Sequence, residues 1–264
     1  MLLFVIALMT FGQRYLDDVF TSVVMTSNVV YGQAVNPYSG QNETLKLDLY
    51  RPQGDTATSR VCIVYAHGGG FVGGSKSQSS SVDFCTRMAK KGYVVFSIDY
   101  RLLPQALRGD YVAGTPLVGS DFRAAIRFVR SKASSYKIDA QRVFTFGSSS
   151  GGFGALAAAY DAALDSLNAS TPGYSGTPNF CAESSGALPA TSVIMAGEPE
   201  LYMMHCLYDD VVPFVLAEGV FNHAVGVLSD ADNYWITDDC HTLVNTDEIA
   251  NTVQRLAEWI FSKR

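Results

Sequence analysis

The feature that most constrains the fold is a regular alternation of short apolar runs with helix-like segments. Residues 61–65 and 93–98 are continuously apolar and rich in β-branched and aromatic side chains, which is typical of strands buried on both faces of a sheet. Residues 81–91 lie between them with apolar side chains at helical spacing, and Gly92 follows as a typical helix stop. Because parallel strands need crossover helices, this pattern predicts a mostly parallel sheet with helices on both faces.

The alternation continues along the chain and predicts one domain. In residues 44–50, leucines alternate with charged side chains, as in an exposed edge strand. The helix at 120–134 is expected to begin near Asp121, whose charge suits a helix N-terminus. The other expected elements are strands over 142–146, 179–182, 201–205 and 234–237 and helices over 149–164 and 243–261. A chain of 264 residues that is 48% hydrophobic can bury a full core, so we expect residues 13–264 to form a single domain.

Charge and the N-terminal segment limit the partners and the location. The net charge is −6 without any cluster of Lys and Arg, which excludes nucleic acid as a partner. The apolar run at 2–9 is too short to span a bilayer, which takes about 20 residues. With the small Gly12 behind it, this run resembles the core of a signal peptide, although a basic start is absent. We expect residues 1–12 to be a signal-peptide remnant and the protein to be exported, secreted or periplasmic; a docking helix and a cytoplasmic location stay open.

A glycine- and serine-rich segment follows the strand expected at 142–146. In this segment, GSSSG at 147–151, the central Ser149 ends a strand and opens a helix. Such a sharp turn holds the serine in a strained conformation and needs glycines on either side to avoid clashes. The motif alone would also fit a simple turn or helix cap, but the flanking strand and helix favour a nucleophilic serine.

A second glycine-rich segment, HGGG at 67–70, follows the strand at 61–65. Its glycines let the backbone approach a ligand closely and turn amides toward it. An amide donor from this loop, paired with the amide of Ser150, is expected to stabilise a tetrahedral intermediate. A flexible glycine turn is the alternative. His67 is expected to anchor the loop rather than to react.

The general base is expected among four histidines. His241 follows the strand at 234–237 and precedes the last helix, which places it in a loop at the carboxyl end of the sheet. His205 ends an apolar strand, where a hydrogen-bonded core role is the default, and His223 falls in a helical stretch. His241 is therefore the expected base.

The carboxylate that orients this base is expected between the serine and the histidine in the chain. Asp209 and Asp210 follow the strand at 201–205. We favour Asp209, because it leaves the strand turn directly and Asp210 would face the opposite way. Asp238 and Asp239 stand beside His241 in sequence, and such close neighbours rarely reach the ring nitrogen Nδ1.

Together these residues resemble the α/β-hydrolase esterases of the hormone-sensitive-lipase and carboxylesterase kind. The resemblance covers about residues 40–262 and rests on HGGGF at 67–71, DYRL at 99–102, GSSSGG at 147–152 and the segment from His205 through Asp209 to Pro213. It implies an α/β-hydrolase fold with 13–264 as its catalytic domain. It also implies a triad and oxyanion amides, namely Ser149 as nucleophile, His241 as base, Asp209 as its partner, and Gly69, Gly70 and Ser150 as amide donors. DYR is a structural signature in that family.

The resemblance implies a serine carboxylic-ester hydrolase that acts through an acyl-enzyme on a small-molecule ester, with no metal or organic cofactor. The stretch before residue 201 is too short for a sizeable cap, so an open cleft and short to moderate acyl chains are expected. Phe71 and Phe153 are candidate substrate-binding residues, as is Phe180. Peptide or amide hydrolysis on the same fold is the alternative, followed by a non-catalytic binding module.

Two cysteines mark the main departure from the family pattern. Cys206 stands where glycine is usual, three residues before Asp209, and Cys240 directly precedes His241. If the triad forms, these two loops are neighbours, and we hypothesise a Cys206–Cys240 disulfide that holds acid and base together. Two packed thiols are the alternative. Cys62 lies in an apolar strand and is expected to be an inert core thiol.

Overall fold

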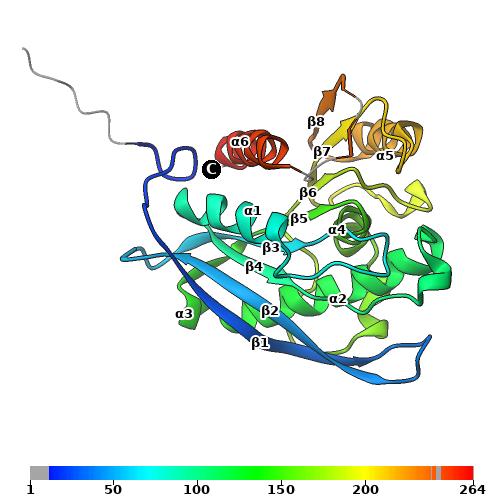
Figure 1. Ribbon diagram of the computed structural model, residues 1–264, viewed down its shortest axis with the longest axis horizontal. Coiled ribbons are helices and arrows are strands. Elements are labelled where there is room, and N and C mark those ends of the chain that lie inside the picture. Colours follow the sequence, from blue (N-terminus) through cyan, green and yellow to red (C-terminus); the bar gives the residue numbers. More distant parts are fainter. Residues whose placement is uncertain (1–11, 239, 242–244, 264) are drawn as a thin grey trace, which may run out of the picture.

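The computed structural model describes residues 12–238, 240–241 and 245–263, which fold around a single sheet (Figure 1). The eight strands of this described part lie side by side in the order β1 (Val23–Val35), β2 (Asn42–Pro52), β4 (Val94–Ile98), β3 (Arg60–Ala66), β5 (Ile138–Ser148), β6 (Phe180–Ser184), β7 (Glu200–Cys206) and β8 (Ala231–Ile236). Strand β2 runs antiparallel to β1 and β4, and all other neighbours are parallel. The predicted α/β-hydrolase fold with a mostly parallel sheet is confirmed.

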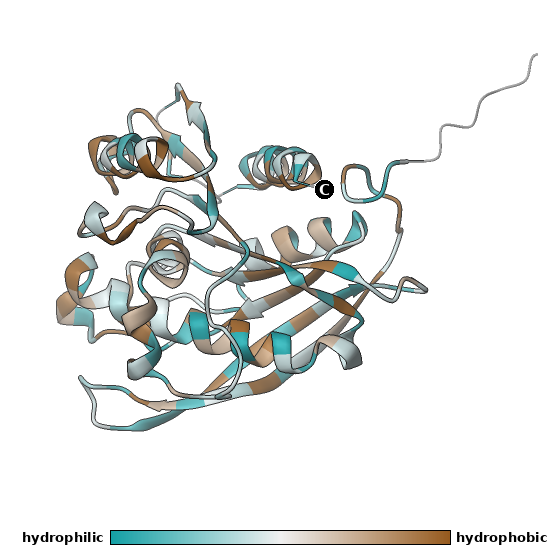
Figure 2. Ribbon diagram, turned by 180° about the vertical axis from the view of Figure 1, so that it is seen from behind, coloured by the Kyte–Doolittle hydropathy of each residue, from teal (hydrophilic) through white to brown (hydrophobic). Residues whose placement is uncertain are grey.

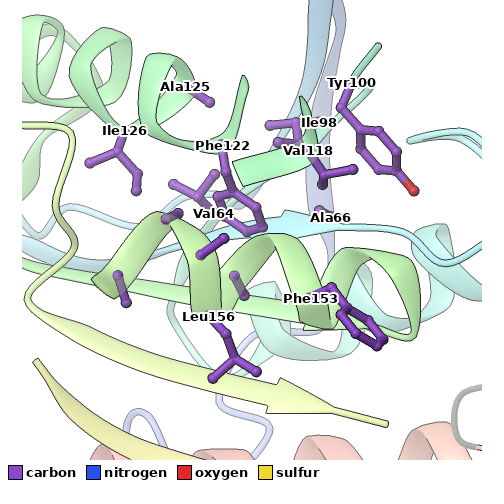
Figure 3. Close-up of a cluster of buried hydrophobic side chains, with 14 of the residues drawn as sticks. Val64, Ala66, Ile98, Tyr100, Val118, Phe122, Ala125, Ile126, Phe153 and Leu156 are labelled. Carbon is purple, nitrogen blue, oxygen red and sulfur yellow. The ribbon is translucent and has the colours of Figure 1, made fainter. Parts of the chain in front are cut away.

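Helices cover both faces of the sheet, as predicted (Figure 1). The helices are α1 (Ser79–Lys90), α2 (Tyr111–Ser131), α3 (Ala133–Tyr136), α4 (Ser150–Tyr160), α5 (Phe214–Val227) and α6 (Thr246–Ser262). Apolar side chains of α1 and α6 pack in one core cluster, and those of α2, α4 and α5 pack in the cluster on the other face. Figure 2 shows the difference between the mixed, amphipathic α6 and the largely hydrophobic α5. Figure 3 shows part of the cluster formed with α2 and α4, including Phe122 and Ile126 of α2, Val64 of β3 and Leu156 of α4.

The first predicted strand is present, but its expected place at the sheet edge is wrong. Strand β2 pairs on both sides, because the unpredicted β1 covers its outer side. The charged residue Asp48, which suggested an exposed face, is buried and lies 3.4 Å from the Lys76 ammonium. The alternation of β2 therefore reflects a buried ion pair as well as solvent exposure.

Helix α2 begins earlier than the predicted start near residue 120. The carboxylate of Asp110 accepts a hydrogen bond from the Ala113 amide at 3.0 Å and caps the helix. Pro116 lies inside the helix, and such a residue weakens the helical signal of the sequence because it lacks an N–H group. Asp121 is consequently in the middle of α2, and its predicted role at the N-terminus is wrong.

Asp121 instead forms a buried ion pair with Arg101 of the segment after β4. The guanidinium Nη2 lies 2.7 Å from Asp121 Oδ1, and both side chains are buried. Arg101 also donates to the carbonyl of Val35 at the end of β1 and to the Ser120 hydroxyl. The Asn168 side chain donates to the same aspartate. This cluster joins four distant segments, which agrees with the structural role expected for residues 99–101.

Two further expectations concern the chain outside the sheet. Residues 161–199, all of them described, add β6 and the 3-10 helices Ala162–Leu167 and Thr191–Val193 but no α-helix, in agreement with the expected lack of a sizeable cap. The expected signal-peptide remnant lies outside the described residues except for Gly12. Across the described part of the chain, no helix has both the length and the apolar character needed to cross a membrane.

The Arg101–Asp121 pair predicts a large difference between two charge deletions. Asp121→Asn leaves a buried guanidinium without its counter-ion and should lower the free energy of unfolding by about 3–5 kcal/mol. The matched control is Asp83→Asn, which breaks the half-exposed pair with Arg87 on α1 and should cost about 1 kcal/mol or less. Urea unfolding followed by circular dichroism measures both, and equal losses would contradict the structural role of Asp121.

Candidate active site

Ser149 occupies the sharp turn between β5 and α4. Its backbone has φ 53° and ψ −122°, a conformation that is strained for a residue with a side chain. A Cβ atom on Gly147 would overlap the carbonyl of Gly151, and one on Gly151 would overlap the carbonyl of Ala66 in β3. The turn therefore requires glycine at both positions, as the sequence predicts.

The segment HGGG at 67–70 leaves β3 beside this turn. A Cβ on Gly68 would lie 3.2 Å from the Cβ of Ser149, so the two segments are in close contact. Gly69 and Gly70 have φ of 147° and 60°, which few other residues adopt. Gly68, Gly69, Gly70 and Ser149 line one cleft of about 460 Å³. The fold thus brings the two glycine-rich segments to a common cavity.

His241 lines the same cleft and is held by Asp209. The distance from His241 Nδ1 to Asp209 Oδ2 is 2.8 Å. The other carboxylate oxygen of Asp209 accepts hydrogen bonds from the amides of Val211 and Val212, each at 2.9 Å. Burial by itself would raise the pKa of Asp209, but these hydrogen bonds and His241 lower it below its usual value. Asp209 is thereby held as an anion beside the imidazole.

The alternative carboxylates do not reach this position. Asp210 is exposed to solvent, as is Asp238, and neither has a hydrogen bond to His241 among the described residues. Asp239 lies outside the described residues. The structure therefore places Ser149 and His241 at one cleft, with Asp209 rather than Asp210 hydrogen-bonded to His241.

The other three histidines have structural contacts, as predicted. His67 is buried, donates from Nδ1 to the Gly68 carbonyl at 2.8 Å and stacks on Tyr100. His205 is fully buried, and its Nε2 lies 2.9 Å from the Val212 carbonyl. Burial lowers the pKa of both rings, which keeps them neutral. His223 of α5 contacts the carbonyl of Ile194.

Ser150 stands at the start of α4, where backbone amides have no acceptor within the helix. Its hydroxyl lies 3.1 Å from the Tyr100 hydroxyl, which also donates to the carbonyl of His67 at 2.8 Å. Tyr100 thus connects the turn at Ser149 to the loop at 67–70. The same contact gives the buried hydroxyl of Ser150 a hydrogen-bond partner.

Phe71 and Phe153, the candidate substrate-binding residues, lie in the core and away from the cleft. Both side chains are buried in the core, with ring centroids 5.6 Å apart in an edge-to-face arrangement, and neither lines the cleft. Phe153 of α4 is a member of the apolar cluster that Figure 3 shows. Phe180 packs against Phe144 and Trp259 on the other side of the sheet. Residue type alone does not reveal which aromatic rings face the core.

Sequence reasoning missed several residues that line the cleft. Gln78 and Ser80 come from the start of α1, Arg108 from the segment before α2, and Val211 from the loop after β7. No motif marks these residues, because only the packing of loops at the carboxyl end of the sheet brings them together. No metal-binding group of three or more His, Cys, Asp or Glu residues is found in the described ranges.

The predicted disulfide is present. Cys206, the last residue of β7, is bonded to Cys240, with 5.6 Å between their Cα atoms. The bond connects the loop of Asp209 directly to the segment of His241. Cys62, Cys85 and Cys181 are free and buried, and burial raises the pKa of the Cys62 thiol to about 12, in agreement with an inert core thiol.

A buried glutamate behind the site was not anticipated. Glu183 of β6 is fully buried, and its Oε2 accepts a hydrogen bond from the Gly186 amide at 2.5 Å. Its Oε1 has no hydrogen-bond partner within the described part of the chain. Burial raises the pKa of Glu183 to about 8, against the effect of the Gly186 bond and with a contribution from the charge of Asp209. Glu183 is therefore mostly protonated at neutral pH.

The disulfide predicts a specific thiol count. The chain has five cysteines, of which three are free. Titration of the unfolded protein with a thiol reagent should therefore detect three thiols without prior reduction and five after it. The Cys206→Ser/Cys240→Ser variant should give three thiols under both conditions and should unfold with about 2–4 kcal/mol less free energy. Five thiols in the unreduced protein would contradict the bond.

Glu183 predicts a pH-dependent stability difference. The folded protein holds the proton of Glu183 up to pH of about 8, whereas the unfolded chain releases it near 4.5, so the free energy of unfolding falls as the pH rises between these values. The amide of the Glu183→Gln variant cannot ionise, so the advantage of this variant over the wild type should grow by on the order of a few kcal/mol from pH 5 to pH 8. Urea unfolding at several pH values measures this, and parallel curves for the two proteins would contradict it.

Comparisons with known proteins identify the family of this chain and other proteins with its fold. Residues 47–183, just over half of the chain, match the BD-FAE family. An ethyl acetate hydrolase of Pseudomonas putida is 36% identical over 111 residues, which cover 41% of this chain and 32% of the relative. The human arylacetamide deacetylase-like 2 is 35% identical over 108 residues, which cover 39% and 25%. The chain thus spans about a fifth to a third of the length of the curated relatives it matches.

The propionate-bound structure of the esterase Est2 from Thermogutta terrifontis has the same fold. It superposes with a TM-score of 0.71 at 20% identity and covers 89% of this chain and 93% of its own. The family match includes both glycine-rich segments, at 67–70 and 147–151. The chain belongs to the BD-FAE family and has the fold of the α/β-hydrolase esterases that its sequence resembles.

Proposed function

We propose that this protein is a serine esterase that hydrolyses small-molecule carboxylic esters through an acyl-enzyme, with Ser149, His241 and Asp209 as its catalytic triad. The observation that carries the proposal is the arrangement around one cleft. Ser149 stands in a strained turn at that cleft, and His241 lines it with Nδ1 held 2.8 Å from the buried carboxylate of Asp209.

The proposed reaction has two steps. The Ser149 hydroxyl attacks the ester carbonyl while His241 accepts its proton at Nε2, the ring nitrogen opposite the one held by Asp209. The tetrahedral intermediate then collapses, and His241 returns the proton to the departing alcohol. In the second step His241 removes a proton from water, which attacks the acyl-enzyme; the bond to Ser149 then breaks, His241 returns the proton to the Ser149 oxygen, and the acid departs.

We propose that the amides of Gly69, Gly70 and Ser150 stabilise the negatively charged oxygen of the intermediate by hydrogen bonds. Gly69 and Gly70 line the cleft, and the amide of Ser150 stands at the start of α4, where the helix itself supplies no acceptor. Such donors act without reorganisation, and the loss of one typically costs about 10²–10³ in turnover. The contact from Tyr100 to both Ser150 and the His67 carbonyl holds the two sources of amides in place.

The relatives and the shape of the site support small esters. One relative is named for the hydrolysis of ethyl acetate. The cleft of about 460 Å³ is not covered by a helical cap from residues 161–199, so no such cap encloses a long acyl chain. Amide hydrolysis is the second candidate, because another relative is named an arylacetamide deacetylase-like protein.

We also propose that residues 13–264 act as one catalytic domain and that the protein is exported. The Cys206–Cys240 bond supports export, because disulfides persist mainly in oxidising compartments.

The triad predicts a sharp contrast between adjacent aspartates. Ser149→Ala should abolish turnover of p-nitrophenyl acetate, and Asp209→Asn should lower kcat on the order of 10⁴-fold, because the imidazole loses the anion that orients it. The matched control is Asp210→Asn, which removes an exposed carboxylate one residue away and should retain activity. Unchanged turnover in Ser149→Ala would overturn the mechanism.

The same assay separates the two candidate reactions. Wild-type kcat/KM is measured on p-nitrophenyl acetate and on p-nitroacetanilide, which differ only in the bond that breaks. An esterase should prefer the ester by several orders of magnitude, whereas comparable values would favour the amidase.

A further inference from the structure

One full positive charge faces the cleft. Arg108 is the only Lys or Arg side chain among its lining residues within the described chain, and no Asp or Glu lines it. The protein as a whole carries a net charge of −6, so a positive charge at the cleft does not follow from a generally basic chain. The proposed triad uses His241 and Asp209 and leaves Arg108 without a role.

The position of Arg108 is fixed relative to the proposed oxyanion hole. The amide of the next residue, Gly109, donates to the carbonyl of Gly70 at 3.1 Å, which ties the two segments together. A Cβ on Gly70 would lie 3.4 Å from Arg108 Nη1 and 3.5 Å from its Cγ. The stem and the guanidinium of Arg108 therefore pass directly over Gly70, next to where the ester carbonyl would bind.

The guanidinium is available to a ligand. In the described part of the chain its hydrogen bond runs from Nη2 to the Gln105 side chain at 3.3 Å, and no carboxylate pairs with it. The nearest acid in sequence, Asp110, is engaged in capping α2 through the Ala113 amide. Arg108 is exposed, so its charge is partly screened by water.

We propose that Arg108 is a specificity-determining residue that makes the cleft select esters bearing a carboxylate a few bonds from the scissile carbonyl. A guanidinium binds a carboxylate through two parallel hydrogen bonds, which gives both attraction and a fixed orientation. This proposal rests on the proposed esterase function. Because the carboxylate does not react, its contact is the same in the bound ester and in the transition state, and the effect falls mainly on KM.

The test uses pairs of esters that differ only in charge. Monoethyl succinate and ethyl succinamate place a carboxylate or a neutral amide on the acyl side. The pair 4-acetoxybenzoate and 4-acetoxybenzamide does the same on the alcohol side. The quantity measured is the ratio of kcat/KM for the charged ester to that for its neutral partner, in the wild type and in variants of Arg108.

In the wild type, the ratio for at least one pair should exceed that in Arg108→Gln by about fivefold to tenfold, mainly through KM. Arg108→Lys should keep part of the preference, and Arg108→Glu should reverse it. About 0.5 M salt should reduce the wild-type ratio, because the pair is partly exposed. Arg87→Gln on α1 is the matched control, since it removes the same charge from a surface pair with Asp83 and should leave the ratio unchanged.

Equal ratios in the wild type and Arg108→Gln for both pairs would overturn this proposal. The neutral esters distinguish that outcome from a failure of the proposed function. If the wild type hydrolyses neutral esters with Ser149 but its ratio of kcat/KM does not depend on Arg108, the proposed esterase function is supported and the proposed selectivity is wrong. If it hydrolyses none of the four esters, both fall.

Discussion

The active cleft depends on close backbone contact between two strand ends. Just beyond the end of β5, Gly151 in the first turn of α4 packs against the carbonyl of Ala66 in β3, and Gly68 lies against Ser149. Any side chain at Gly147 or Gly151 would overlap backbone atoms, which cannot move without separating the strands. This steric condition explains why the strained conformation of Ser149 persists, since the surrounding sheet and helix α4 fix it from both sides. It also holds the amides of both glycine-rich segments at one place.

Asp209 and His241, on the other side of the cleft, are held in place by hydrogen bonds and a disulfide rather than by close backbone packing. Asp209 is fixed by two backbone amides and by His241, and the Cys206–Cys240 disulfide joins the loops from which they come. Loops at the end of a sheet have few packing contacts of their own. The disulfide and the charge-assisted hydrogen bonds therefore fix the positions of Asp209 and His241, as close backbone packing fixes the position of Ser149. Buried neutral groups, His205 and Glu183, lie behind them. Their ionisation would place further charges near Asp209, and burial opposes it.

The sequence predicts the parallel sheet better than it predicts the borders and neighbours of its elements. Helix α2 begins before its predicted start. The sequence does not reveal this, because Pro116 interrupts the helical pattern, whereas in the structure packing and the Asp110 cap sustain the helix. Strand β2 has the pattern of an edge strand, but local alternation does not show whether another strand covers it. Residue type suggests Phe71 and Phe153 for the cleft, whereas α4 and its contacts turn Phe153 into the core.

The sequence by itself determined the fold class, the two glycine-rich segments and the order of serine, acid and histidine, because each depends on local pattern or on backbone geometry that only glycine allows. It also suggested that Cys206 and Cys240 meet. Only the tertiary structure decided that Asp209 rather than Asp210 holds His241, that Arg108 lies over Gly70, and that Glu183 is fully buried. These facts depend on which side chains distant segments bring together, and that is set by packing rather than by spacing along the chain.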